Sequence, residues 1–277
     1  MKEGYWVIRT YVSGGRVGEK TKFWIPGERE ATARGRRREQ SEIKKQEQNE
    51  HSAVKSLARI LNENVKAGDI ILGLDYSDRG LLKLEAFCKR KGLSLREMSE
   101  AERMEALRDA AEHELVLCWR RVKRELEKDG ITFKCYGAIT SDMDGETGET
   151  VRVHHHLVIN RESLEAFVKK WTLGGVNYKT LREQEDYTPI AEYFLCQVRK
   201  IPNAKKYITT RNIVRPAPKD RVAQSDAELR VPKGAKILYR NEFKPGNPQY
   251  IRYTLPKKGK SAGGLPDEET ECEQEGG

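Results

Sequence analysis

The chain contains the run Val153-His154-His155-His156-Leu157-Val158-Ile159, which holds three of its five histidines. Turn-forming residues precede this run and apolar residues end it, a pattern typical of a β-strand. Alternate side chains of a strand point to opposite faces, so His154 and His156 share one face while His155 points to the other. The run therefore predicts a strand that presents two imidazoles side by side.

Such a pair of imidazoles predicts a metal site, although ordinary half-buried histidines are a competing interpretation. Two imidazoles separated by one residue on a rigid strand can bind the same divalent cation. To hold Mg²⁺ or Mn²⁺ the site also needs oxygen ligands, and carboxylates lie in the preceding turn. If the flanking strands pair about Glu146, Asp142 shares the face of His154 and His156 and is the expected third ligand. The alternatives for this ligand are Asp144, Glu146 and Glu149.

Strand and helix patterns alternate on both sides of the histidine run. Residues 131–141 predict a strand that pairs with 151–159, and the apolar run 68–76 predicts a central strand. Apolar residues recur at spacings of three and four over 101–128, which indicates a long amphipathic helix. This order predicts an α+β fold, with an antiparallel sheet and helices covering one of its faces. Further helices are expected at 161–170 and 189–200.

The two ends of the chain differ from this middle part. Alternating residues at 5–25 predict an N-terminal hairpin, and the charged segment 28–50 predicts an exposed helix or a flexible arm. The acidic end, rich in Gly and Glu, is expected to be disordered. The expected units are a hairpin and basic arm (1–50), the main domain (51–216), a C-terminal extension packing on it (217–258) and a disordered tail (259–277).

The basic character of the chain indicates a polyanionic partner. A net charge of +9 over 277 residues favours binding to phosphates, because neutralising them releases condensed counterions. The basic residues concentrate in the segments 34–45 and 199–221. The candidate phosphate contacts are Arg36, Arg37, Arg38, Lys205, Lys206 and Arg211.

The cysteines and the hydropathy indicate a cytoplasmic protein. Five cysteines, an odd number with no CxxC pair among them, predict reduced thiols without a disulfide framework. No apolar run is long enough to span a bilayer, and no secretion signal is recognisable near the N-terminus. We therefore expect neither a membrane anchor nor export.

A tyrosine follows the histidine strand on a predicted helix. Thr188-Pro189 is an N-cap and first-turn signature, so a helix begins here with Tyr193 on its second turn. A cation that neutralises a phosphodiester allows a tyrosine to attack it and to keep the phosphate as an ester. Tyr187 precedes the cap and lies off the face of Tyr193, so a single nucleophile is expected. The competing interpretation of Tyr193 is a helix aromatic packed on the sheet.

The combination of a strand, a helix, two strands ending in the histidine run and a helix with a tyrosine resembles the HUH endonuclease superfamily. It is most similar to the single-tyrosine rolling-circle replication initiators of bacterial plasmids, phages and integrated mobile elements. The likeness covers 70–216 and includes the apolar strand 70–75. It also includes 206–216, Lys-Tyr-Ile-Thr-Thr-Arg-Asn-Ile-Val-Arg-Pro, which looks like the Ser-Arg-Asn-Leu-x-x-Pro stretch that often follows the tyrosine helix.

The resemblance implies a five-stranded antiparallel sheet with flanking helices, and Mg²⁺ or Mn²⁺ bound by His154 and His156. It also implies that Tyr193 nicks single-stranded DNA at a replication origin, forming a 5′-phosphotyrosine and a free 3′-hydroxyl that primes synthesis. Cys196 stands where family members often carry Lys. Lys200 lies about two helical turns after Tyr193 and is expected to present its charge on the same face.

Other functions fit parts of this pattern. A non-catalytic DNA-binding protein, such as a repressor or a decayed initiator, would use the basic segments alone. A relaxase or a transposase of the same superfamily is a closer alternative, although relaxases usually supply three metal-binding histidines and His155 points away. No P-loop follows the histidine region, so unwinding and synthesis are expected to come from a host helicase and polymerase in a bacterial cytoplasm.

Overall fold

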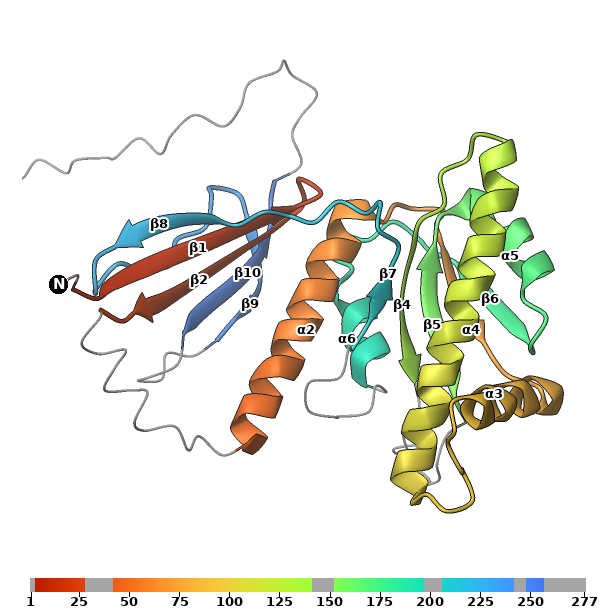
Figure 1. Cartoon of the computed structure of the whole chain (residues 1–277). Coiled ribbons are helices and arrows are strands. Elements are labelled where there is room, and N and C mark those ends of the chain that lie inside the picture. The colour runs from red at the N-terminus through yellow and green to blue at the C-terminus, as the bar shows by residue number, and fades with distance from the viewer. Residues whose placement is uncertain (1–2, 28–41, 141–151, 197–205, 242–247, 257–277) are drawn as a thin grey trace, which may run out of the picture.

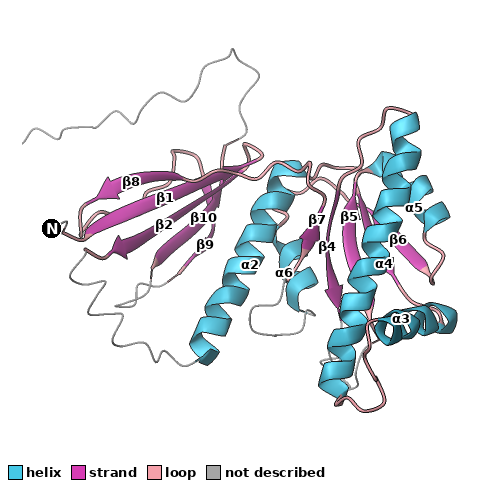
Figure 2. Ribbon diagram, viewed as in Figure 1, coloured by secondary structure: helices cyan, strands magenta, loops and turns pink. Residues whose placement is uncertain are grey.

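The computed structural model describes residues 3–27, 42–140, 152–196, 206–241 and 248–256. These residues form two antiparallel sheets of five strands each and five α-helices (Figure 1 and Figure 2). The expected α+β class is confirmed, but the expectation of one sheet with a separate hairpin is wrong. The described helices include none that is both long enough and apolar enough to cross a membrane. Residues 28–41 of the segment 28–50 that was expected to form a basic arm, and the expected tail at 259–277, lie outside the described residues.

One sheet carries the histidines, and we call it the histidine sheet. Its central strand β5 pairs with β3 on one side and β4 on the other, as expected for a returning hairpin strand and a buried neighbour. Thr140 pairs with His154, so the pairing of β4 and β5 is centred on Thr147, one residue later than expected. In order across the sheet, the strands are β6 (Val176–Thr180), β3 (Ile70–Leu74), β5 (His154–Ile159), β4 (Cys135–Thr140) and β7 (Ile208–Thr209).

Helices cover both faces of the histidine sheet, which corrects the expectation of one covered face. One face packs against α3 (Asp78–Arg90), α4 (Glu100–Lys128) and α5 (Leu164–Lys170). The other packs against α2 (Glu42–Asn64) and α6 (Thr188–Cys196). The reason lies in β4, where every residue is buried, and in the end of β5, where Leu157, Val158 and Ile159 are buried on both faces. The apolar stripe expected on α4 is confirmed, since Leu107, Ala111, Leu115, Trp119, Val122 and Leu126 are all buried.

The helix α2 begins within the segment 28–50, for which an exposed helix was one of two expectations, but its continuation to Asn64 was not predicted. Its second half carries Leu57 and Leu61, both fully buried. They join a core cluster with Tyr136 and Val158 of the histidine sheet and Phe194 of α6. Most of the stability of such a helix comes from packing this apolar face. The helix therefore covers part of one face of the histidine sheet.

The second sheet contains strands from both ends of the described chain. The expected N-terminal hairpin is confirmed as β1 (Tyr5–Ser13) and β2 (Val17–Ile25). Three strands from the predicted C-terminal extension complete the sheet: β8 pairs with β1, β10 pairs with β2, and β9 pairs with β10, in the order β8-β1-β2-β10-β9. Their bounds are β8 (Lys219–Ala223), β9 (Lys236–Arg240) and β10 (Gln249–Thr254). The helix α2 lies between the two sheets (Figure 1), so both sheets contribute to its surroundings.

Candidate metal and nucleophile site

The strand β5 brings His154 and His156 together on the face of the sheet that packs against α6. Their Nε2 atoms lie 3.2 Å apart, with the rings at 90° to each other. The Nδ1 atom of His154 lies 2.8 Å from the carbonyl oxygen of Arg152, to which it donates a hydrogen bond. This bond assigns the proton to Nδ1, so the Nε2 atom of the neutral ring carries a free electron pair. The predicted pairing of the two imidazoles on one face is confirmed.

The spacing of these nitrogen atoms fits a shared cation. Two ligand atoms about 2.1 Å from one ion lie about 3.0 Å apart at an angle of about 90° and about 3.4 Å apart at the tetrahedral angle. The observed 3.2 Å falls between these separations. Small residues flank His156 in the sheet, with Gly73 opposite it on β3 and Ala138 on β4. The separation of the two imidazole nitrogens therefore meets the distance requirement for two ligands of one ion.

His155 points into the core on the opposite face, as predicted. Its side chain is fully buried, and its Nε2 atom is hydrogen-bonded to the Tyr76 hydroxyl at 2.7 Å. Its ring also packs edge-on against Trp171. Burial lowers the pKa of His155 to about 3, and the neighbouring His154 adds to this shift, so the ring is neutral. His155 is therefore a structural residue on the face of the sheet opposite the candidate site.

The His155–Tyr76 pair provides a stability prediction. Tyr76→Phe leaves His155 buried without its hydrogen bond and should lower the free energy of unfolding by about 1–3 kcal/mol. Adding His155→Leu replaces both polar partners with apolar ones and should restore most of that loss. Urea unfolding of the single and double variants measures this coupling. A double variant less stable than Tyr76→Phe would show that His155 is held by contacts other than this hydrogen bond.

The helix α6 carries Tyr193 to the same two imidazoles. The Tyr193 and His156 ring centroids lie 5.0 Å apart, and the Tyr193 side chain is 49% exposed. The next residue, Phe194, is fully buried and stacks on His156 with ring centroids 5.7 Å apart. Phe194 thus fixes α6 against the histidine strand while Tyr193 remains open to solvent. The competing interpretation of Tyr193, a helix aromatic packed on the sheet, also fits its ring contact with His156, so the role of nucleophile remains a prediction.

Tyr187, the other tyrosine near the start of this helix, is fully buried. Its ring packs in the core cluster between α2 and α6, so its hydroxyl is inaccessible to a DNA strand. The helix begins at Thr188 as expected, but the N-cap assignment is wrong. The carboxylate of Asp186 accepts hydrogen bonds from both the backbone N–H and the hydroxyl of Thr188, at 2.9 and 2.6 Å. Asp186 therefore supplies the acceptor that caps α6.

The third metal ligand remains a prediction. Asp142 and its alternatives Asp144, Glu146 and Glu149 lie outside the described residues. In the described parts of the chain, no three His, Cys, Asp or Glu side chains are grouped to hold a metal ion. Two imidazoles alone leave several coordination positions for oxygen ligands and water.

The predicted DNA contacts fall only partly on described residues. Lys206 is half-buried and Arg211 is exposed, both beside β7. In the motif-like stretch around Arg211, the Asn212 side chain donates to the carbonyl oxygen of Phe133 at 2.9 Å. The backbone N–H of Thr210 donates to the carbonyl oxygen of Cys135 at 2.9 Å, so the stretch is fastened to β4. The other candidates, Arg36, Arg37, Arg38, Lys200 and Lys205, lie outside the described residues.

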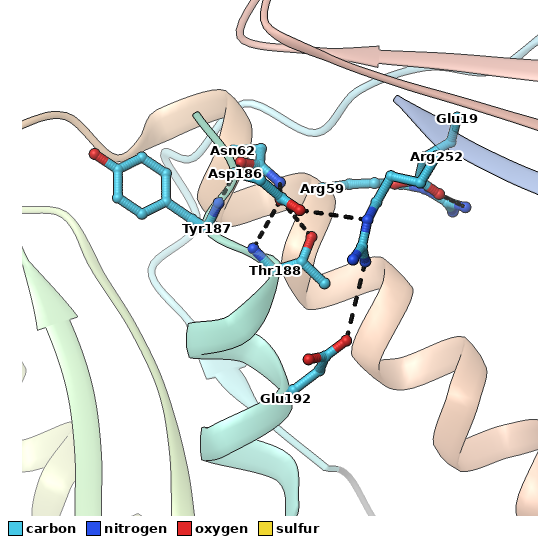
Figure 3. A network of polar contacts seen from close by, with 8 residues as sticks. All are labelled: Glu19, Arg59, Asn62, Asp186, Tyr187, Thr188, Glu192 and Arg252. Carbon is cyan, nitrogen blue, oxygen red and sulfur yellow. Dashed lines mark hydrogen bonds and ion pairs between the residues drawn. The ribbon is translucent and has the colours of Figure 1, made fainter. Parts of the chain in front are cut away.

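Several residues of the site were not predicted from the sequence. Phe194 and Asp186 are adjacent to recognised residues but carry no motif of their own. Asn62 and Arg252 also contact the start of α6, from α2 and β10 (Figure 3). No family model matches the chain, and no curated protein or solved structure matches it. The choice of a function therefore rests on the geometry of His154, His156 and Tyr193.

Proposed function

We propose that this protein is a metal-dependent DNA nicking enzyme of the HUH type that initiates rolling-circle replication. The observation that carries the proposal is the approach of the exposed Tyr193 ring to His156, whose Nε2 atom lies 3.2 Å from that of His154. A nucleophile beside a cation site is what phosphodiester cleavage requires. The substrate would be single-stranded DNA at a replication origin.

His154 and His156 would hold the divalent cation, with oxygen ligands completing the shell. When bound, the ion would neutralise charge on the phosphate oxygens and orient the phosphorus for in-line attack. Imidazole nitrogen is a softer donor than carboxylate or water, and Mg²⁺ prefers oxygen. We therefore expect Mn²⁺ to support cleavage at lower concentration than Mg²⁺.

Tyr193 would act as the nucleophile. Its phenolic oxygen loses a proton to solvent and bonds to the phosphorus, and the bond from phosphorus to the 3′ oxygen breaks. The released 3′ oxygen takes up a proton and becomes the hydroxyl that primes a polymerase. The phosphate remains as a 5′-phosphotyrosine, which keeps the ester available for later rejoining. A host helicase would supply the unwound strand.

The proposal is tested with single-stranded oligonucleotides that tile the DNA carrying the gene, with and without Mn²⁺. We expect one oligonucleotide to be cleaved only with metal, with its 3′ fragment linked to the protein. Binding without cleavage of any oligonucleotide would favour the non-catalytic DNA-binding alternative. His155 points to the opposite face of the sheet, so β5 presents two imidazoles to the site. This number favours an initiator over a relaxase, which usually supplies three metal-binding histidines.

The basic arm provides a separate prediction about affinity. Arg36, Arg37 and Arg38→Gln together should flatten the slope of log affinity for single-stranded DNA against log salt by up to about 2.1, since each phosphate contact on a single strand contributes about 0.7. The matched control removes three charges from exposed positions of α4, at Arg120, Lys123 and Arg124. Fluorescence anisotropy over a salt series measures both slopes. Equal slopes for the two triple variants would show that the arm does not contact DNA.

A further inference from the structure

Asn62 of α2 is a buried link to the start of the tyrosine helix. Its side-chain Nδ2 donates to Asp186 Oδ1 at 2.9 Å, and its Oδ1 accepts from the backbone N–H of Tyr187 at 2.8 Å (Figure 3). Only 1% of Asn62 is exposed. Both functional groups of this amide are therefore used to fix the two residues that precede α6.

Asp186 accepts several of the hydrogen bonds that hold the start of α6. Its Oδ1 atom accepts from Asn62 and from the Thr188 N–H and hydroxyl, as described above. Its negative charge also lies at the N-terminus of α6, where the helix dipole favours an anion. A helix of nine residues is too short to be stable alone. The groups that hold this carboxylate therefore fix the start of α6, while Phe194 packs its later part against the sheet.

The second sheet reaches the same carboxylate through Arg252 on β10. Arg252 Nε lies 3.3 Å from Asp186 Oδ2, and both side chains are largely buried. The contact is an ion pair without hydrogen-bond geometry, since this Nε atom has no hydrogen-bond partner among the described residues. Arg252 Nη1 also lies 4.0 Å from Oε1 of Glu192, the residue before Tyr193 (Figure 3). One guanidinium therefore spans the first turns of the tyrosine helix.

The second sheet also contacts α2, the helix that carries Asn62. Arg59 of α2 donates to Glu19 of β2 at 2.7 Å and stacks over the Tyr11 ring. Arg16, in the turn between β1 and β2, donates to the carbonyl oxygen atoms of Asn62 and Val65, each at 3.0 Å. The second sheet therefore contacts the start of α6 directly through Arg252, and indirectly through its contacts with α2.

From these contacts we infer that Arg252 is a positioning residue for Tyr193, and that the second sheet aligns the nucleophile without touching the metal site. This inference rests on the proposed function of Tyr193. A displacement of about 1 Å of a reacting group can lower a rate by about a hundredfold. Loosening the first turns of α6 should therefore slow the cleavage step while leaving DNA binding largely unchanged.

The test compares Arg252→Met with the matched control Arg9→Met. Arg9 forms a closer ion pair, with Asp220 at 2.7 Å, in the same sheet but away from α6. Both variants lose one positive charge. At saturating oligonucleotide and Mn²⁺, Arg252→Met should form the covalent adduct about tenfold more slowly than Arg9→Met. Oligonucleotide affinity should differ by less than about twofold between the two, and Arg252→Lys should recover part of the rate.

Amide hydrogen exchange gives a second measurement that needs no activity. Exchange in 188–196 should be faster in Arg252→Met than in Arg9→Met, because α6 opens locally once its anchor is lost. Equal adduct rates and equal exchange in the two variants would overturn the inference. Unequal exchange in a chain whose unaltered form makes no adduct would instead refute the proposed function, while leaving the anchoring of α6 intact. If Arg252→Met does not fold, Arg252→Gln against Arg9→Gln gives the same comparison.

Discussion

Tyr193→Phe is expected to lose covalent attachment to DNA completely. The substitution removes only the phenolic oxygen and keeps the ring beside His156, where the centroids lie 5.0 Å apart. Without a nucleophile the rate should fall by about 10³-fold or more. Denaturing gel electrophoresis of a labelled oligonucleotide after incubation with Mn²⁺ measures the adduct directly. Affinity for the same oligonucleotide should stay within about twofold, because phosphate contacts dominate it.

Two other tyrosines serve as controls. Tyr178 on β6 is 60% exposed, so Tyr178→Phe tests whether any accessible phenol can carry the phosphate. Tyr187 is fully buried, and its hydroxyl has no hydrogen-bond partner among the described residues, so Tyr187→Phe should be tolerated. Both variants should form the adduct at nearly the unaltered rate. An adduct that persists in Tyr193→Phe and disappears in either control would assign the nucleophile to that other tyrosine.

His154→Ala and His156→Ala should each abolish metal-dependent nicking. Each change removes one of two nitrogen ligands, and with two protein imidazoles a single loss should weaken Mn²⁺ binding by about a hundredfold or more. Isothermal titration with Mn²⁺ and cleavage at a fixed metal concentration measure the two effects. DNA affinity should remain nearly intact, because it comes from phosphate contacts elsewhere.

The matched control for the histidines is His113→Ala on α4. His113 is 44% exposed and stacks on Phe87 of α3. Both helices cover the face of the histidine sheet to which His155 points, opposite the candidate site. The His113→Ala variant should bind Mn²⁺ and cleave like the unaltered protein. His155→Leu should also retain cleavage in the folded protein, since His155 faces the core. Cleavage lost in His155→Leu but retained in His154→Ala would reverse the assignment of the strand faces.

The histidine strand and the tyrosine helix could be predicted because their signals are local. Alternation along a strand fixes which of His154, His155 and His156 share a face, whatever the rest of the fold. The Thr188-Pro189 start places Tyr193 on the second turn of a helix, although the capping acceptor is Asp186. The centre of the hairpin pairing was missed by one residue, because the sequence between its two strands offers no periodic signal to locate it.

The second sheet and the contacts around α6 could not be predicted in the same way. The strands β8 and β9 are short and mostly exposed, so they show no alternation of apolar and polar residues. The pairing of β8 with β1 brings together segments about two hundred residues apart, such as Arg9 and Asp220. Asn62 and Asp186 are separated by 124 positions. Their roles depend on tertiary packing, which single-sequence patterns do not report.

The most direct test of the central claim is to locate the DNA on the protein after cleavage. The cleaved complex formed with Mn²⁺ is digested with a protease and a nuclease, and the remaining nucleotide is mapped by peptide mass spectrometry. The account predicts a 5′-phosphate attached to Tyr193, within the peptide that follows Arg182. Attachment at any other residue, or cleavage of the DNA with no nucleotide left on the protein, would contradict it.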